Sequence, residues 1–258
     1  MRERPGVAFG RRGISDVVGY VLVFSLVVSV VGVVSVAGFS SLDGVRDAEQ
    51  ANNAERAFDV LADNVADVYA NGAPSRGTEI SLSDASLRTT ETVTVNVTAR
   101  NTTTSNEFIF KMGSTPIVWQ GTKETELVYS LGAVLRQEPD GGVVIDETPS
   151  QYDSDRTFIH LVQLRAPQKQ VGGTTVRLRT VASSSEVLLP EGTDYDELRL
   201  NITTPRADIW RRHLERYPDT DCSVVTVADV PADTVTCDLS DRDAVYVTLT
   251  RIDVSIEG

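Results

Sequence analysis

The chain has 258 residues, of which 41% are hydrophobic, enough for one globular domain with an apolar core. Its formal net charge is −13, and only three of its 24 basic residues are Lys (Lys111, Lys123 and Lys169), which leaves 21 Arg. This acidic balance argues against a nucleic-acid partner, because binding to a phosphate backbone requires clustered Lys and Arg.

An uncharged segment close to the N-terminus is the first element along the chain. From Val17 to Leu42 there are 26 residues without a charge, and Arg2, Arg4, Arg11 and Arg12 precede them. As a helix this segment would be about 39 Å long, enough to cross a hydrocarbon core of about 30 Å. The basic flank predicts a cytoplasmic N-terminus and an extracellular C-terminal domain.

Three fates of this segment remain open from the residues alone. A secretory signal peptidase could cut after Ala37. The apolar stretch, however, is longer than the apolar region of a secretory signal peptide, which usually has about 7–15 residues. The segment could also stay as an uncut single-span anchor. In the third alternative a peptidase cuts at Gly13 on the cytoplasmic side, which explains why Arg11, Arg12 and Gly13 directly precede the apolar run.

Arg11-Arg12-Gly13 followed by Ile14-Ser15-Asp16 resembles the class III signal peptide of archaeal, and especially haloarchaeal, type IV pilin-like and archaellin-like surface proteins. These signals have a basic residue, a small residue at the cut, and a Ser-containing start to a long apolar helix. Haloarchaeal pilins often have Pro where this chain has Asp16. The resemblance implies cleavage between Gly13 and Ile14 by a prepilin peptidase, and assembly with other pilin-like subunits through residues 14–39.

Two further features accord with this resemblance. The segment LVYSLGAVLRQEPDGGVVIDETP, residues 127–149, is similar to one found in poorly characterised haloarchaeal proteins with pilin-like N-termini. An acidic excess with few Lys is also typical of proteins from salt-loving archaea; an ordinary acidic protein is the alternative.

After Asp43 the helix is expected to continue with one apolar face. Apolar residues recur every three or four positions, at Val45, Ala48, Ala51, Ala54, Phe58, Leu61, Val65 and Val68. The sequence Asn71-Gly72-Ala73-Pro74 is a helix-stop signal. One long helix is therefore predicted from about residue 15 to about residue 70.

Strand patterns dominate the rest of the chain. β-branched segments lie at residues 92–100, 107–112, 126–135, 142–146, 158–166, 174–182, 197–204 and 243–256. They predict an antiparallel, sandwich-like β domain. Residues 206–218 interrupt them with a short amphipathic helix, whose apolar positions are Ile209, Trp210, His213, Leu214 and Tyr217. The predicted fold class is thus α+β: a long pilin-type helix followed by a β-rich head domain.

The two cysteines and three sequons are the candidate modification sites. Residues 222–237 read as a hairpin with its turn near residues 229–232, which would bring Cys222 and Cys237 face to face as a disulfide; two buried free thiols are the alternative. Asn96, Asn101 and Asn201 begin N-x-Thr sequons and are predicted N-glycosylation sites. The alternative is that they are ordinary strand and loop residues.

No catalytic or cofactor motif accompanies these features. His160 is predicted to lie on a sheet face, and His213 on the short helix. The acidic triplets at residues 153–155 and 219–221 lack the spacing of a calcium loop and read as solvated turns. No enzymatic activity, cofactor or metal is therefore expected.

The resulting domain prediction has four parts: a signal peptide at residues 1–13, a membrane or filament-core helix at 14–42, an amphipathic extension at 43–72, and an extracellular head domain at 73–258. The expected function is that of a pilin-like surface subunit, assembled into or associated with a filament, with a role in adhesion. The alternatives are a single-span, membrane-anchored binding or sensing glycoprotein and a secreted enzyme, which would need a pocket with His160 or His213 beside carboxylates.

Overall fold

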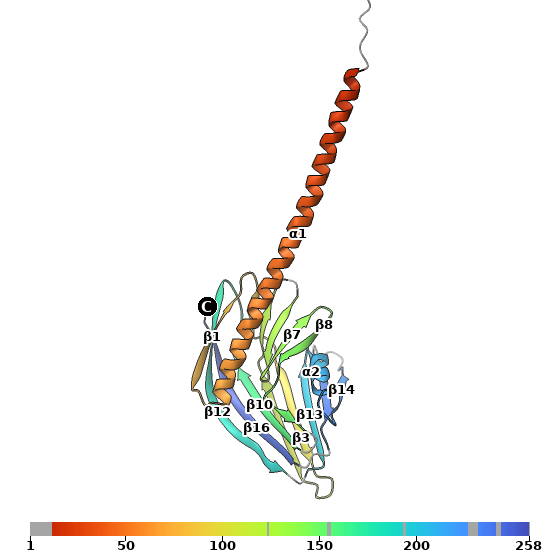
Figure 1. Ribbon diagram of the computed structural model, residues 1–258. Coiled ribbons are helices and arrows are strands. Elements are labelled where there is room, and N and C mark those ends of the chain that lie inside the picture. Colours follow the sequence, from red (N-terminus) through yellow and green to blue (C-terminus); the bar gives the residue numbers. More distant parts are fainter. Residues whose placement is uncertain are drawn as a thin grey trace, which may run out of the picture. The chain divides into compact units, whose positions relative to one another are not determined.

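The computed structural model describes residues 12–122, 124–153, 156–192, 195–226, 232–240 and 244–257. The chain divides into two compact units, Met1–Glu49 and Gln50–Gly258. We refer to the second unit as the head domain. It holds three β-sheets, the short helix α2 (Ala207–Leu214) and the C-terminal part of the long helix α1 (Figure 1).

Helix α1 spans Arg12–Tyr69, which confirms the predicted long helix. It ends where the stop signal lies: Gly72 has a φ of +69°, and the backbone N–H of Ala73 donates to the carbonyl oxygen of Asp67 at 3.0 Å. A residue with a side chain would be strained at that φ, which is why glycine is favoured just beyond a helix end.

Within the head domain, α1 buries one apolar face. Its buried side chains are Ala51, Ala54, Phe58, Leu61, Ala62, Val65 and Val68. The predicted stripe is wrong in its first two positions, because Val45 is 56% exposed and Ala48 is also exposed. Both residues belong to the first unit, whereas burial begins at Ala51 in the head domain.

The described residues of the head domain form three sheets. Sheet A has the order β1 (Ser75–Ser81), β12 (Thr175–Gly192), β16 (Ala244–Glu257), β10 (Arg156–Arg165) and β9 (Gln151–Tyr152). Sheet B has the order β11 (Gln170–Gly172), β2 (Ser86–Arg88), β5 (Ile117–Gln120), β6 (Glu126–Ser130), β7 (Ala133–Glu138) and β8 (Gly141–Asp146). Sheet C has the order β14 (Asp221–Val225), β15 (Asp233–Asp238), β13 (Glu197–Thr204), β3 (Val93–Arg100) and β4 (Glu107–Ser114).

Two apolar cores lie on the two faces of sheet A. One core packs Ile159, Val247 and Leu249 of sheet A with inward side chains of sheet C and with Trp210 and Leu214 of α2. The other packs Ile252 and Val254 with α1 and with inward side chains of sheet B. The predicted β-rich head and amphipathic short helix are confirmed, although three sheets replace a simple two-layer sandwich.

The predicted strand at residues 126–135 is wrong, because the chain turns back on itself there. Strands β6 and β7 form an antiparallel pair in which Ser130 lies opposite Ala133. The turn residues Leu131 and Gly132 have φ of +54° and +88°, as a tight hairpin turn requires. A β-carbon on Gly132 would come within 2.6 Å of Pro149, so this position needs glycine for space as well as for conformation.

Candidate functional site

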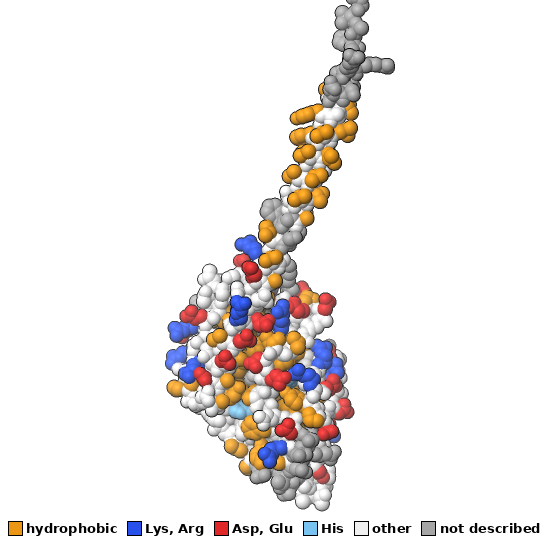
Figure 2. All heavy atoms as spheres, viewed as in Figure 1, with side chains coloured by type: hydrophobic (Ala, Val, Ile, Leu, Met, Phe, Trp, Pro, Cys, Tyr) orange, Lys and Arg blue, Asp and Glu red, His pale blue; other side chains and the backbone are white. Residues whose placement is uncertain are grey.

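The most distinctive surface is the apolar part of α1 in the first unit. Val17–Ala37 is a 21-residue segment with a mean hydropathy of 2.7, long and apolar enough to cross a membrane. Every side chain in this segment is exposed, and Figure 2 shows hydrophobic side chains along this part of the helix. Exposed apolar surface on this scale marks a membrane or protein contact in general.

Small residues interrupt this apolar surface. Apart from the adjacent residues and backbone of the helix itself, no described atom lies within 4 Å of where a β-carbon would sit on Gly19 or Gly32. The hydroxyl of Ser29 donates to the carbonyl oxygen of Ser25 at 2.8 Å, which satisfies it within the helix. Such back-bonding lets Ser reside in an apolar helix without an unpaired donor.

The signal-peptide residues lie at the edge of the described structure. Arg11 is outside the described residues. Arg12, Gly13, Ile14, Ser15 and Asp16 belong to the first turns of α1, and their side chains are not described. Processing at Gly13 therefore stays a prediction.

Cys222 and Cys237 form a disulfide, which confirms the predicted pairing. They lie directly opposite each other on β14 and β15, with Cα atoms 4.1 Å apart. The predicted hairpin turn at residues 229–232 falls mostly outside the described residues. The bond clamps β14, at one edge of sheet C, onto its neighbour.

Removing this disulfide is expected to lower the free energy of unfolding by about 3 kcal/mol, the loop-closure value for a loop of about 15 residues. The Cys222→Ser/Cys237→Ser double variant should therefore unfold at a lower urea concentration than the wild type. Adding a reductant should shift the unfolding midpoint of the wild type toward that of the variant and leave the midpoint of the variant unchanged. A midpoint unaffected by both changes would contradict the prediction.

The three sequon asparagines occupy two different environments. Asn96 and Asn201 lie opposite each other on β3 and β13, in the middle of sheet C. Both are half-buried, and within the described structure neither Oδ1 atom has a hydrogen-bond partner. The Oδ1 of Asn101 accepts hydrogen bonds from the backbone N–H groups of Thr103 at 2.9 Å and Thr104 at 2.6 Å, in the turn after β3. Glycosylation of these residues stays a prediction.

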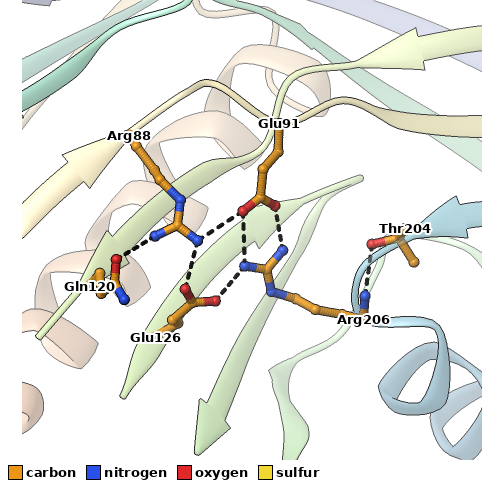
Figure 3. A network of polar contacts seen from close by, with 6 residues as sticks. All are labelled: Arg88, Glu91, Gln120, Glu126, Thr204 and Arg206. Carbon is orange, nitrogen blue, oxygen red and sulfur yellow. Dashed lines mark hydrogen bonds and ion pairs between the residues drawn. The ribbon is translucent and has the colours of Figure 1, made fainter. Parts of the chain in front are cut away.

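A buried ion network is a feature that the sequence patterns do not indicate (Figure 3). Arg206 lies between β13 and α2 and is 4% exposed. Its guanidinium contacts Glu91 and Glu126, each at 2.5 Å. Arg88 contacts the same two carboxylates at 2.8 and 2.6 Å and donates to Gln120 at 2.8 Å. Two guanidiniums and two carboxylates thus alternate in a closed ring.

This ring connects sheet B to sheet C. Arg88 belongs to β2 and Glu126 to β6, whereas Arg206 follows β13. Burial alone would raise the pKa of Glu91, but hydrogen bonds and charge from Arg206, and then from Arg88, hold it below its ordinary value. Burial alone would lower the pKa of Arg88, but hydrogen bonds to Glu126 and Glu91 hold it above its ordinary value. Both groups are therefore stabilised in their charged forms.

The lowered pKa of Glu91 predicts a pH-dependent contribution to stability. The Glu91 charge stabilises the fold above its ordinary pKa of 4.5, and this contribution is lost as the pH falls through the lower folded-state value. The difference in urea-unfolding free energy between wild type and Glu91→Gln should thus shrink as the pH is lowered from 7 to below about 4.5. Glu107→Gln, in the exposed pair with Arg100, is the control. A difference that stays constant down to pH 3 would refute the role of Glu91.

Both histidines lie where the sequence predicts. His160 is half-buried on β10, with its Nε2 atom 3.2 Å from the Thr250 hydroxyl, and burial lowers its pKa. It lines a cavity of about 20 Å³ with Tyr152 and Trp210, which has room for one water. His213 is buried on α2, and burial followed by the charge of Arg216 lowers its pKa.

The secreted-enzyme alternative would need a pocket with carboxylates beside His160 or His213. No Asp or Glu is among the described residues that line the cavity beside His160. Asp219, Thr220 and Asp221 line an open cleft with Glu215 and Asp238. Among the described residues, no group of three or more His, Cys, Asp or Glu side chains could hold a metal ion. Ser154 and Asp155 lie outside the described residues.

Comparison with known proteins gives one match. No curated protein and no solved structure matches the chain. A family model, described as a family of unknown function (DUF7289), matches residues 12–255, nearly the whole chain from the start of α1 to Ser255 in β16. The protein therefore belongs to the DUF7289 family.

Proposed function

We propose that this protein is a pilin-like surface subunit. Its N-terminus lies in the cytoplasm, a prepilin peptidase cuts it between Gly13 and Ile14, and its apolar helix packs with the helices of other pilin-like subunits in a surface filament or on its base in the membrane. The head domain faces the exterior and mediates adhesion or subunit contacts.

The observation that carries this proposal is the change along α1 in how its apolar side chains are exposed. From Val17 to Ala37 all side chains are exposed and apolar or small, whereas from Ala51 to Val68 one apolar face is buried in the head domain. A helix that is apolar all round requires lipid or other apolar helices on every side. A subunit that moves from the membrane into a helical bundle meets this requirement in both states.

The mature N-terminus tests the proposal. Mass spectrometry of the native protein, from membrane and shed-surface fractions, should find a chain that starts at Ile14. A Gly13→Val variant should retain residues 1–13, while Gly10→Val, a control on the same N-terminal segment, should be cut normally. A chain that starts at Gly38 would instead indicate a secreted head domain.

A membrane-anchored binding or sensing glycoprotein that does not polymerise is the second candidate. It is favoured by the self-contained head domain, which has two apolar cores of its own and needs only a single anchor. This alternative predicts an intact N-terminus and monomers in the membrane. Chemical cross-linking in intact cells, through reactive residues introduced into the first unit, would distinguish the two candidates: assembled subunits should form cross-linked multimers, whereas a monomeric anchor should not.

A further inference from the structure

Strand β4 lies at one edge of sheet C and has an unpaired side. It pairs with β3, and no described strand pairs with its other side. With eight residues, it is the longest of the six strands that end the three sheets. The strand contains no proline, and Ile109 in its middle is 60% exposed. An open edge of this kind is a template for pairing with another strand.

The turn before β4 shows which of its backbone groups are free. The backbone N–H of Asn101 donates to the carbonyl oxygen of Asn106 at 2.8 Å, across the turn between β3 and β4. The backbone groups of successive residues in an antiparallel strand point to alternate sides. Asn106 points toward β3, so the N–H and C=O groups of Glu107, Ile109 and Lys111 point away from β3.

Strand β10 occupies the far end of this edge. The carbonyl oxygen of Gly113 accepts a hydrogen bond from the side-chain amide of Gln163 at 2.6 Å. The backbone N–H of Thr115 donates to the carbonyl oxygen of Leu164 at 2.9 Å. The free part of the edge is therefore residues 107–111, which we call the open edge.

Opposite charges flank an apolar residue on the open edge. Glu107, Ile109 and Lys111 are exposed and share the outer face of sheet C. Phe108 and Phe110 point to the other face, where they are half-buried against the core. The stretch Glu-Phe-Ile-Phe-Lys is thus symmetric about Ile109 except that its two ends carry opposite charges.

We propose that the open edge pairs with the open edge of a second copy of this chain, antiparallel and about a two-fold axis at Ile109. In this register Ile109 lies opposite Ile109 of the second copy, and each Glu107 lies opposite a Lys111. Each Phe108 lies opposite a Phe110. The outward-pointing N–H and C=O groups of the three exposed residues face one another in the same register, so each residue donates one hydrogen bond and accepts one.

Charge selects this register over the other symmetric ones. A two-fold axis at Glu107 or at Lys111 would place like charges directly opposite each other, which is destabilising. An axis at Phe108 or at Phe110 would place Ile109 opposite a charged residue and leave the other charge without an opposite one. The order of charges along the open edge therefore fits a second copy of the same stretch in one register.

The surroundings of the open edge do not oppose this contact. The net charge of −13 causes general repulsion between two copies. At the open edge, however, Glu107 lies near Lys111 and also contacts Arg100 of β3 at 2.7 Å. A carboxylate can accept hydrogen bonds from two cations at once, so Glu107 can keep Arg100 while it meets Lys111 of the second copy.

This pairing goes beyond the proposed function and does not rest on it. A two-fold contact joins two subunits and then closes, so it links the heads of two filaments or of two anchored subunits and does not itself build a filament. One short strand pair is a weak contact, and many such contacts act together where subunits are arrayed. A cross-link at the open edge and a cut at Gly13 are separate measurements, so the two proposals can fail independently.

Cysteine cross-linking of the purified full chain in detergent micelles provides the test. The native cysteines are joined to each other, so Ile109→Cys introduces the single free thiol. In the proposed register the two Cα atoms of residue 109 are about 5.5 Å apart, within the span of a disulfide. Mild oxidation should therefore give a covalent dimer. Val143→Cys is the matched control, because Val143 is 54% exposed on β8, an edge strand of sheet B, and it should stay monomeric.

Mixed cysteine variants test the register. Two copies of Glu107→Cys would have their thiols about 13 Å apart along the strands, and so would two copies of Lys111→Cys. Each variant alone should therefore stay monomeric on oxidation. A mixture of the two should form a dimer that contains one copy of each, because residue 107 faces residue 111 and the second ion pair is retained.

A charge reversal tests the selectivity. Ile109→Cys/Lys111→Glu places like charges opposite each other on both sides of the axis, so the yield of dimer should fall about tenfold or more. Ile109→Cys/Lys169→Glu makes the same change of charge at another exposed lysine and should keep its yield. Three results would overturn the proposal: no more dimer from Ile109→Cys than from Val143→Cys, cross-linking of Glu107→Cys to itself, or equal effects of the two charge reversals.

Discussion

Replacing Arg206 with Met is expected to lower the free energy of unfolding by about 3–5 kcal/mol, the usual cost of removing one partner from a buried ion pair. Arg206 contacts both Glu91 and Glu126 at 2.5 Å. Without it, Arg88 alone would have to compensate two buried carboxylates. Equilibrium urea unfolding at pH 7, followed by circular dichroism, measures this loss.

Arg100→Met is the matched control for this prediction. Arg100 also contacts a carboxylate, that of Glu107, at 2.7 Å, but the two side chains are 53% and 36% exposed. Exposed pairs of this kind contribute about 0–1 kcal/mol, so the control should unfold close to the wild type. Equal effects of the two substitutions would mean that the ring around Arg206 has no special role in stability.

A double-mutant cycle separates the ion pair from simple packing. Met fills part of the volume of Arg206, so the Arg206→Met/Glu126→Gln double variant removes one charge of each sign from the ring. If charge compensation carries the effect, the double variant should lose less stability than the sum of the two single variants. Additive losses would instead assign the effect to the packing of each side chain.

The ion ring also shows where sequence patterns reach their limit. Glu91 and Arg206 are separated by 115 positions along the chain, and Arg206 begins a segment that reads as the exposed start of a short amphipathic helix. Periodicity describes which face of an element is apolar. It carries no information on which charged side chains from distant strands meet inside the fold.

In contrast, sequence patterns predict a structural feature well where that feature depends only on residues close together in the chain. The length of α1 follows from an unbroken apolar and amphipathic pattern that Gly72 terminates, and the Cys222–Cys237 disulfide follows from a hairpin of the right length. The same reasoning fails at residues 126–135, where a continuous β-branched pattern conceals a turn at Leu131 and Gly132. The order of strands in three sheets, including the parallel pairing of β10 with β16, depends on contacts between distant segments.

Replacing two valines with arginine in the apolar part of α1 is expected to have the largest effect of the proposed substitutions, because it opposes insertion into a membrane. Val27 and Val31 lie one helical turn apart near the middle of Val17–Ala37, and they are 54% and 58% exposed. An arginine at the centre of a membrane helix costs about 2.5–3.5 kcal/mol, and each Val, Leu or Phe contributes about 0.3–0.6 kcal/mol. Two arginines therefore cancel most of the insertion free energy of the segment.

The Val27→Arg/Val31→Arg variant should leave the membrane fraction after a carbonate wash, with its integrated share reduced about tenfold or more by this cost. Val45→Arg/Val60→Arg adds the same charge to exposed positions of the same helix, at 56% and 52% exposure, outside the apolar segment, and should stay integrated. Protease resistance of the head domain should be equal in both variants, because neither pair lies in its cores. Equal membrane retention of the two variants would mean that Val17–Ala37 does not cross the bilayer, and the pilin-like subunit and the single-span anchor would fail together.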